Sequence, residues 1–382
     1  MNFSEKYKER IAEIIQCNPD SIFLYWKGRI ALYAILRAIG VRGGDEVILP
    51  GFTCVVVPNA IIYAGAKPIY VDISPENFNM NVELIENLIS PKTKAIICQN
   101  TFGLSSNIEI ILDIAKKHSL YTIEDCTHGF GGYYNGKPNG SFCDAAFYST
   151  QWNKPFSTGI GGFMVINNQL LLEKIKILEK EKINSGFSER MMLGALLLFK
   201  NLFVNKYTHW FLVNLYRLFS KQNIVVGSNQ GEELSSTKMP KNYFKDISLI
   251  QILIGINKLK KIDKVNQLRL KNANEYSRFL KSRGKNYVNE KLFANNLFLK
   301  YPLLVKNRDK IFQLAKRDNI TLGDWFLSPL HPVKENLQLW NFIEEKFPIA
   351  VQMSKNIVNL PTDISDNREV IEFLDNNIDL IQ

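Results

Sequence analysis

Three side chains that could do chemistry together stand in residues 123–162, IEDCTHGFGGYYNGKPNGSFCDAAFYSTQWNKPFSTGIGG. Asp125 closes one apolar run, Ser149 closes the next, and Lys154 follows in a short loop before a glycine-rich turn. If parallel strands carry these runs, their carboxyl ends meet at one edge of the sheet, where ligands bind in such folds. The edge would then offer an acid, an amine and a hydroxyl.

These groups are what a protein needs to hold pyridoxal phosphate. Lys154 leaves a strand end into an aromatic loop with Trp152 and Phe156, and partial desolvation there would lower its pKa and make the amine a better nucleophile. Asp125 beside the pyridine nitrogen would keep that nitrogen protonated, so that the ring can accept an electron pair from the substrate. The sequence therefore predicts pyridoxal phosphate as the cofactor.

The phosphate of this cofactor needs a helix N-terminus and a hydroxyl. Gly28 and Arg29 open the helical pattern IALYAIL, and Ser149 offers the hydroxyl. Asn100 also follows a strand-like run and is a further candidate at the same edge. Each residue has a simpler interpretation as a surface lysine, a capping aspartate or a serine bonded to local backbone. Their order in one α/β unit favours the cofactor site.

The elements that must position these residues follow from the apolar pattern. Short apolar runs at 46–50, 67–73, 94–100, 120–126, 145–150 and 161–167 alternate with helical patterns after Gly28 and at 53–65, 81–89 and 107–118. Strands that are apolar on both faces and joined by helices are typical of a buried, mostly parallel sheet. We expect a doubly wound α/β domain.

The chain divides into two expected domains. Residues 1–249 form the large cofactor-binding α/β domain, with an insertion at about 185–240, and residues 250–382 form a smaller α+β domain. The second domain opens with a long basic helix, continues through the mixed segment FLKYPLLV (298–305), and ends with a short strand LPT (360–362) and a terminal helix.

The insertion has an unusual composition between residues 190 and 231. It is rich in large apolar and aromatic side chains and contains five Lys or Arg and no acid before Glu232. Its apolar runs fall short of the roughly 18–20 residues that span a membrane. The simpler interpretation is an apolar face that packs on the core or on a partner subunit. The alternative is an interfacial helix on anionic lipid, with Trp210, Phe211 and Tyr216 at the headgroups.

Composition excludes several classes of protein. The 382 residues carry a formal charge of +10, but the basic residues are interleaved with acids, as in 258–272 (KLKKIDKVNQLRLKN), which argues against nucleic-acid binding. The four histidines form no HExxH or HxxxH pair, and the five cysteines form no CxxC pair, so we predict no metal site and reduced thiols. The start has no secretory signal, and we expect a cytoplasmic protein, peripheral to the inner membrane face if the insertion binds lipid.

Several ordered motifs resemble one family. GDEVILPGFTCVVVPNAIIYAGAKPIYVDISPENFNM, SPKTKAIICQNTFG, IEDCTHGFGGYYNGKPNGSFCDAAFYST and NKPFSTGIGGFMVIN resemble successive blocks of the DegT/StrS family of pyridoxal-phosphate-dependent sugar aminotransferases. The match runs from about residue 28 to 168, then resumes weakly in QILIGINKLKKID and NIVNLPTDI. The resemblance implies the fold-type I aminotransferase architecture and a homodimer whose active site lies at the subunit interface.

The resemblance also implies roles for individual residues. Lys154 is similar in position to the Schiff-base lysine, Asp125 to the partner of the pyridine nitrogen, and Ser149 to a phosphate ligand. His128 corresponds to a Gln or His near the 3-oxygen of the cofactor. Because Lys154 is present, the chain does not resemble the dehydratase branch of the family.

The chain departs from the family pattern at three places. Gly28 and Arg29 stand where the family has a Gly-Thr pair, so Arg29 brings a cation toward phosphate or a substrate carboxylate. Cys54 stands where many members have a stacking aromatic, a role that then falls to Phe52 or Phe102. The Asn-x-Arg motif is not recognisable in residues 240–251, where Asn242 and Lys245 are the candidates.

The resemblance implies an aminotransferase that moves an amino group from L-glutamate to a nucleotide-linked 4-keto-6-deoxy-hexose, for surface polysaccharide, lipopolysaccharide or glycolipid synthesis. Two alternatives remain open. One is a pyridoxal-phosphate enzyme acting on a lipid-linked or other carbonyl at the membrane surface. The other is a regulatory or scaffold protein without turnover, which the intact pair of Lys154 and Asp125 disfavours.

Overall fold

A computed structural model describes the whole chain except residues 1, 206, 222–224, 226, 228–230 and 294–295. The described α-helices are α1 (Phe3–Ile15), α2 (Gly28–Ile39), α3 (Val56–Tyr63), α4 (Ile108–Lys117), α5 (Gln169–Leu178), α6 (Phe187–Phe203), α7 (His209–Lys221), α8 (Leu249–Leu259), α9 (Ile262–Ser282), α10 (Arg308–Arg317), α11 (Pro348–Asn356) and α12 (Arg368–Asn376). The described strands are β1 (Ile22–Tyr25), β2 (Glu46–Pro50), β3 (Thr53–Cys54), β4 (Lys67–Val71), β5 (Thr93–Gln99), β6 (Tyr121–Asp125), β7 (Tyr133–Tyr134), β8 (Lys137–Pro138), β9 (Ala145–Ser149), β10 (Gly162–Ile166), β11 (Tyr301–Leu304), β12 (Leu330–His331) and β13 (Ile357–Leu360).

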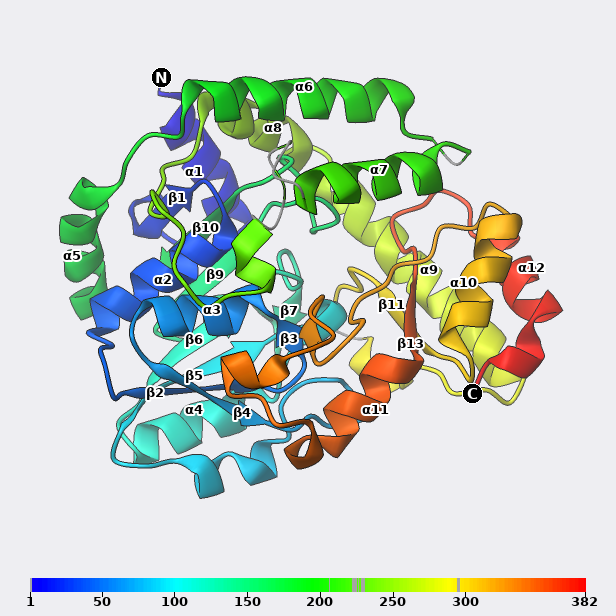
Figure 1. Cartoon of the computed structure of the whole chain (residues 1–382), viewed down its shortest axis with the longest axis horizontal. Coiled ribbons are helices and arrows are strands. Elements are labelled where there is room, and N and C mark those ends of the chain that lie inside the picture. Colours follow the sequence, from blue (N-terminus) through cyan, green and yellow to red (C-terminus); the bar gives the residue numbers. More distant parts are fainter. Residues whose placement is uncertain (1, 206, 222–224, 226, 228–230, 294–295) are drawn as a thin grey trace.

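A seven-stranded sheet forms the centre of the molecule, in the order β1-β10-β9-β6-β5-β2-β4 (Figure 1). The pairs from β9 to β4 are parallel, and β10 runs antiparallel to both of its neighbours. The six apolar runs predicted from the sequence are six of these strands. The predicted α/β class with a mostly parallel sheet is therefore confirmed.

Helices cover both faces of this sheet, which explains why its strands are apolar on both sides. On one face, α2 packs against β9 and β10 and against α3 and α5. On the other face, α4 lies over β5 and β6, while α1 and α8 pack together over β1, β9 and β10. The carboxyl ends of β5, β6 and β9 therefore meet at one edge.

The C-terminal part contains the antiparallel pair β11 and β13 with α9, α10, α11 and α12 around it (Figure 1). The predicted long basic helix is two helices, α8 and α9, of which α8 packs on α1. The division at residue 250 stays a prediction.

Three local predictions need correction. Residues 81–89 form two short 3-10 turns rather than a helix, since only Ile85 among residues 82–88 is buried. The strand expected at 360–362 lies at Ile357–Leu360, because Pro361 cannot donate to a ladder. Strand β1 was not predicted: its four apolar residues stand directly before α2 and are easily taken for its first turn.

Candidate active site

Asp125 is the last residue of β6, and its carboxylate lies at the carboxyl edge of the sheet. The side chain is buried, and Oδ1 accepts a hydrogen bond from the backbone N–H of Thr127 (3.0 Å). Burial raises the pKa of Asp125, while the hydrogen bonds of Thr127 and the charge of Lys154 oppose this rise. Asp125 is thus a desolvated acid held in place beside a lysine.

Lys154 lies in the loop that joins β9 to β10, where its ammonium Nζ is 4.5 Å from the centre of the Trp325 ring. Burial lowers the pKa of Lys154 from 10.5 to about 8, and the positive charge of Arg29 adds to this fall. The negative charge of Asp125 acts in the opposite direction. An amine with this pKa is unprotonated in a useful fraction near neutral pH, as a nucleophile toward an aldehyde must be.

His128 lies three residues after Asp125 and is buried. Its ring stacks on the Trp325 ring, with centres 4.5 Å apart and an angle of 8° between the planes. The backbone N–H of Phe102 donates to Nδ1 (3.1 Å), so the proton of the neutral ring is assigned to Nε2. Burial and the charge of Lys154 hold the pKa of His128 well below 6.5, so His128 is a neutral donor at Nε2.

The N-terminus of α2 lies directly against the end of β9. A Cβ atom added at Gly28 would stand 2.6 Å from the carbonyl oxygen of Tyr148 and 3.0 Å from Cβ of Ser149, so only glycine fits. In the part of the chain that the structure describes, no side chain caps the helix, so the N–H of Gly28 at its start can bind a ligand. The preceding residue, Lys27, is buried, and its Nζ has no hydrogen-bond partner among the described residues.

The side chain of Arg29 is paired within the chain. Its guanidinium forms a buried ion pair with Glu233, with Nη1 2.6 Å from Oε2 and both side chains at most 3% exposed. The backbone carbonyl of Glu233 also accepts a hydrogen bond from Asn59 Nδ2 (2.9 Å). The cation that replaces the family's hydroxyl residue is therefore balanced within the chain.

Of the remaining predicted residues, Cys54 lies close enough to Lys154 to feel its charge, and Asn100 does not join the site. Cys54, in β3, feels the charges of Arg29 and Lys154, although burial raises the pKa of its thiol. Asn100 donates to Oε1 of Glu124 (2.9 Å), and Glu124 precedes Asp125 on the strand and points to the opposite face. The structure does not bring Asn100 together with Lys154.

The aromatic ring nearest to Lys154 was not predicted. Phe52 and Phe102, the expected stacking residues, are fully buried and pack against Phe326. Trp325 instead presents its ring to His128 and Lys154. It belongs to a loop about 170 residues further along the chain, and the aromatic pair before SPLHP is the one local signal that marks it.

Helices α6 and α7, which form the predicted insertion, contact the Lys154 loop through Trp152. The Trp152 indole N–H donates to the Tyr216 hydroxyl (2.9 Å), and Lys200 Nζ lies 4.7 Å from the centre of the same indole. Arg217 of α7 pairs with Asp324 (2.9 Å), the residue before the stacking tryptophan. Helices α6 and α7 thus contact both loops that carry the reactive site.

The residues present fit pyridoxal phosphate. The glycine at the start of α2 lets the uncapped helix N-terminus lie directly against Ser149, where N–H groups and a hydroxyl could bind a phosphate. Asp125 and Lys154 are an acid and an amine of the required kind, near enough for each to shift the pKa of the other. Among the described residues, no group of His, Cys, Asp and Glu could hold a metal ion.

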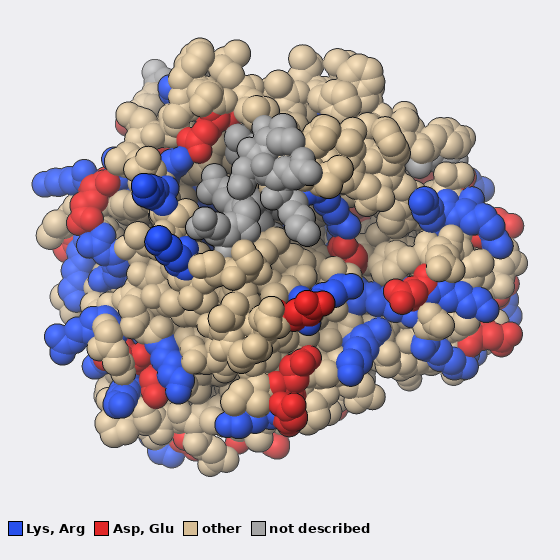
Figure 2. Space-filling view, viewed as in Figure 1, with Lys and Arg blue, Asp and Glu red and all other residues tan. Residues whose placement is uncertain are grey.

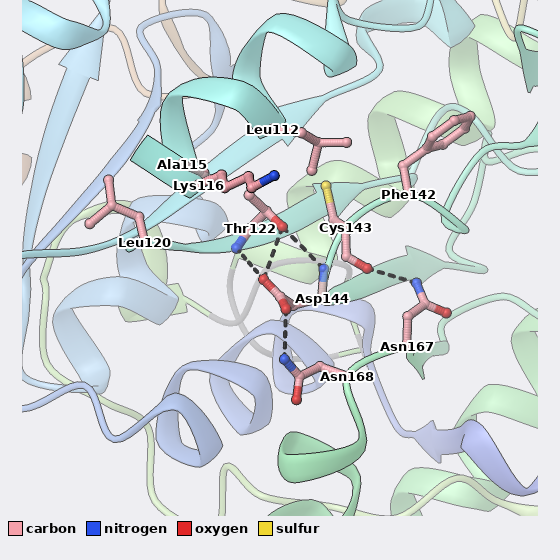
Figure 3. A pocket seen from close by; sticks show the side chains of 10 residues that line it. All are labelled: Leu112, Ala115, Lys116, Leu120, Thr122, Phe142, Cys143, Asp144, Asn167 and Asn168. Carbon is pink, nitrogen blue, oxygen red and sulfur yellow. Dashed lines mark hydrogen bonds between the residues drawn. The ribbon is translucent and has the colours of Figure 1, made fainter. Parts of the chain in front are cut away.

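A different hollow, of about 500 Å³, opens at the opposite end of the same strands (Figure 3). Its polar side chains bond to one another. Asp144 accepts from the backbone N–H and hydroxyl of Thr122 (2.9 and 3.0 Å) and from Asn168 Nδ2 (2.7 Å), and Asn167 donates to the carbonyl of Cys143 (2.8 Å). These bonds fix the starts of β6 and α5, so the hollow has a structural explanation.

Comparison with known proteins defines the class. The sequence model of the DegT/DnrJ/EryC1/StrS aminotransferase family matches residues 26–196 and 216–373, and the chain belongs to this family. The predicted family, fold type and cofactor are confirmed, since pyridoxal phosphate is the cofactor of these aminotransferases. Residues 197–215 lie outside the match.

Particular relatives share parts of the chain. The GDP-perosamine synthase of Escherichia coli O157:H7 is 39% identical over 173 residues, which are 45% of this chain and 47% of that protein. The UDP-2-acetamido-2-deoxy-3-oxo-D-glucuronate aminotransferase of Pseudomonas aeruginosa is 39% identical over 150 residues, 39% of this chain and 42% of the relative. The chain thus spans about half the length of the first curated relatives it matches.

Among solved structures, a putative sugar aminotransferase from Streptococcus pneumoniae in its PMP form superimposes with a TM-score of 0.74. The two chains are 19% identical, and the match covers 98% of this chain and 90% of the other. This likeness shows that the two proteins share a fold over 98% of this chain.

Proposed function

We propose that the protein is a pyridoxal-phosphate-dependent aminotransferase that moves an amino group from L-glutamate to a keto sugar, a nucleotide-linked 4-keto-6-deoxy-hexose, for surface polysaccharide, lipopolysaccharide or glycolipid synthesis. One observation carries this proposal. An amine with a lowered pKa, a buried carboxylate and an uncapped helix N-terminus gather at the carboxyl edge of the sheet, in a chain of this family.

Each residue then has a physical task. The uncapped N–H groups at Gly28 and the Ser149 hydroxyl bind the phosphate, and Asp125 holds a proton at the pyridine nitrogen. When bound, pyridoxal phosphate supplies an electron sink for the bonds at the substrate α-carbon. Lys154 would hold the cofactor aldehyde through its amine, and its free amine would carry the proton that leaves that carbon. His128 would orient the cofactor by donating from Nε2.

The names of two relatives support a keto sugar attached to a nucleotide. One relative is a GDP-perosamine synthase, and the other is named for a UDP-linked 3-oxo sugar acid. Positive charge close to the site is compatible with an anionic substrate, because the charge of Lys300 helps to lower the pKa of His128.

The assembly is also part of the proposal. We propose a homodimer with the active site at the interface, on the cytoplasmic side of the cell. No helix among the described residues is long and apolar enough to cross a membrane.

The first test is covalent trapping. Purified protein loaded with pyridoxal phosphate is reduced with borohydride, digested, and mapped by mass spectrometry, in parallel with Lys154→Ala and the control Lys300→Ala. We expect the adduct on Lys154 and none in Lys154→Ala. Transfer of nitrogen from labelled glutamate to nucleotide keto sugars then tests the substrate. An adduct elsewhere, or the same labelling in both variants, would contradict the proposal.

A second candidate substrate is a lipid-linked carbonyl compound. The observation that favours it is the contact of the apolar helices α6 and α7 with the Lys154 loop through Trp152. Amination of a lipid-linked keto sugar, with no turnover of the nucleotide-linked form, would select this candidate.

A further inference from the structure

Helices α6 and α7 leave a large apolar surface exposed. Along α6, Phe187, Met191, Leu198 and Leu202 recur on one stripe, each at least 60% exposed. Phe203 at the end of α6 and Phe211 on α7 extend the surface. We call these six residues the α6–α7 face. Figure 2 shows few charged side chains on the surface over the two helices. Exposed apolar area of this extent normally marks an interaction site.

The core does not account for this face. On α6 only Leu193 and Leu197 are buried, and they approach Gly159 in the turn after Lys154. The inner sides of α6 and α7 are occupied by the contacts to Trp152 and Asp324 already described. The apolar stripe on the outer side of α6 therefore takes no part in holding the two helices on the rest of the chain. Part of it, residues 197–215, lies in the segment that the family model does not match.

The charge of the segment around the α6–α7 face indicates which kind of partner can cover it. From residue 190 to residue 231 the sequence has five Lys or Arg and no Asp or Glu. Arg217 is paired with Asp324 and Lys200 lies over Trp152, whereas Arg190, on the same helix as the stripe, is exposed. In a two-fold symmetric contact each patch meets its own copy, so two copies of this segment would bring like charges together. An anionic lipid surface carries the complementary charge and attracts basic segments. Apolar side chains flanked by basic ones, on a helix too short and too interrupted to span, are what an interfacial helix has.

We propose that the α6–α7 face docks on an anionic lipid bilayer, with α6 lying in the plane of the interface. The same two helices hold the Lys154 loop, so docking places the active site at the membrane surface. The proposal concerns where the enzyme acts and does not depend on which ketone is aminated. A homodimer formed through another surface of the chain is compatible with it.

The test is co-sedimentation of the full-length protein, loaded with pyridoxal phosphate, with phosphatidylcholine vesicles that contain or lack phosphatidylglycerol. We expect binding to the anionic vesicles, and a loss of binding as salt screens the charges. The paired variant Leu198→Gln with Leu202→Gln should bind about tenfold more weakly or worse, since two apolar side chains leave the interface. Phe211→Ser on α7 gives an independent second variant.

The matched control is Leu170→Gln with Ile177→Gln on α5, which replaces equally exposed apolar side chains away from the face. This control should bind vesicles as the wild type does. Lys154→Ala should also bind normally, so a failure of the proposed chemistry would not affect this result. Wild type that stays in the supernatant, or face variants that bind like the control, would overturn the proposal. Face variants that convert a dimer to a monomer without any vesicle binding would show that a second copy covers the face.

Discussion

The lowered pKa of Lys154 predicts how fast the protein captures its cofactor at different pH values. Only the unprotonated amine attacks an aldehyde. With a pKa of about 8, about one Lys154 in ten is unprotonated at pH 7, against about one in 3,000 at the ordinary value of 10.5. The structure therefore predicts capture about 300-fold faster at pH 7 than for an exposed lysine.

The assay mixes apoprotein rapidly with pyridoxal phosphate and follows absorbance from about pH 6 to pH 10, a range that spans both pKa values. The rate should rise about tenfold per pH unit at the acidic end and level off above about pH 8. His128 does not disturb this profile, because burial keeps its pKa well below 6.5. Lys27, with a pKa also lowered to about 8, is controlled by repeating the assay with Lys27→Met.

The variant Asp125→Asn tests the direction in which the Asp125 charge shifts the pKa of Lys154. The Asp125 charge raises the pKa of Lys154, so removing it should move the inflection to lower pH, even though the variant holds the cofactor less well. A rate that keeps rising tenfold per unit through pH 10 would show that Lys154 is solvated. An inflection that moves to higher pH in Asp125→Asn would refute the electrostatic reasoning itself.

Two further predictions concern stability and are checked by urea denaturation. Glu233→Gln removes the carboxylate charge that faces the buried Arg29 guanidinium and should lower the free energy of unfolding by about 3–5 kcal/mol. The double variant Arg29→Met with Glu233→Met should recover most of this loss, and a double variant as unstable as the single one would mean that the pair is not the cause. Gly28→Ala should cost about 1–3 kcal/mol, because its Cβ has no room beside β9. Gly43→Ala, where nothing lies within 4 Å, should change stability by less than about 0.5 kcal/mol, and equal losses in both would contradict the packing argument.

The parts of the site that the sequence predicts correctly are those carried by strand ends. Asp125 and Ser149 close buried apolar runs, and Lys154 follows within one loop, so the sheet alone brings them to one edge. Asn100 shows the limit of this reasoning. Side chains alternate along a strand, and Gln99, not Asn100, pairs with Asp125 across β5 and β6. A boundary uncertain by one residue turns a side chain to the wrong face.

The partners that arrive from distant segments could not be predicted. Trp325 reaches His128 only because β12 pairs with β3, a contact between segments almost 280 residues apart. Local patterns predict strands and helices, since they depend on neighbouring residues, but they contain no information on which loop closes over which strand end. The turns at 82–88 illustrate the reverse, because a helical pattern without a surface to bury does not become a helix.

The ion pair of Arg29 with Glu233 changes which groups are expected to bind the phosphate. From the sequence, an arginine in place of the family's small hydroxyl residue predicts a direct contact with an anion. In the structure its guanidinium is paired with Glu233, whose backbone carbonyl accepts a hydrogen bond from Asn59. The pair therefore joins the segment at residue 233 to α2, and the phosphate is left to the helix N-terminus and Ser149. It follows that replacing Arg29 and Glu233 together should preserve cofactor affinity, measured by titration with pyridoxal phosphate, whereas Ser149→Ala should weaken it.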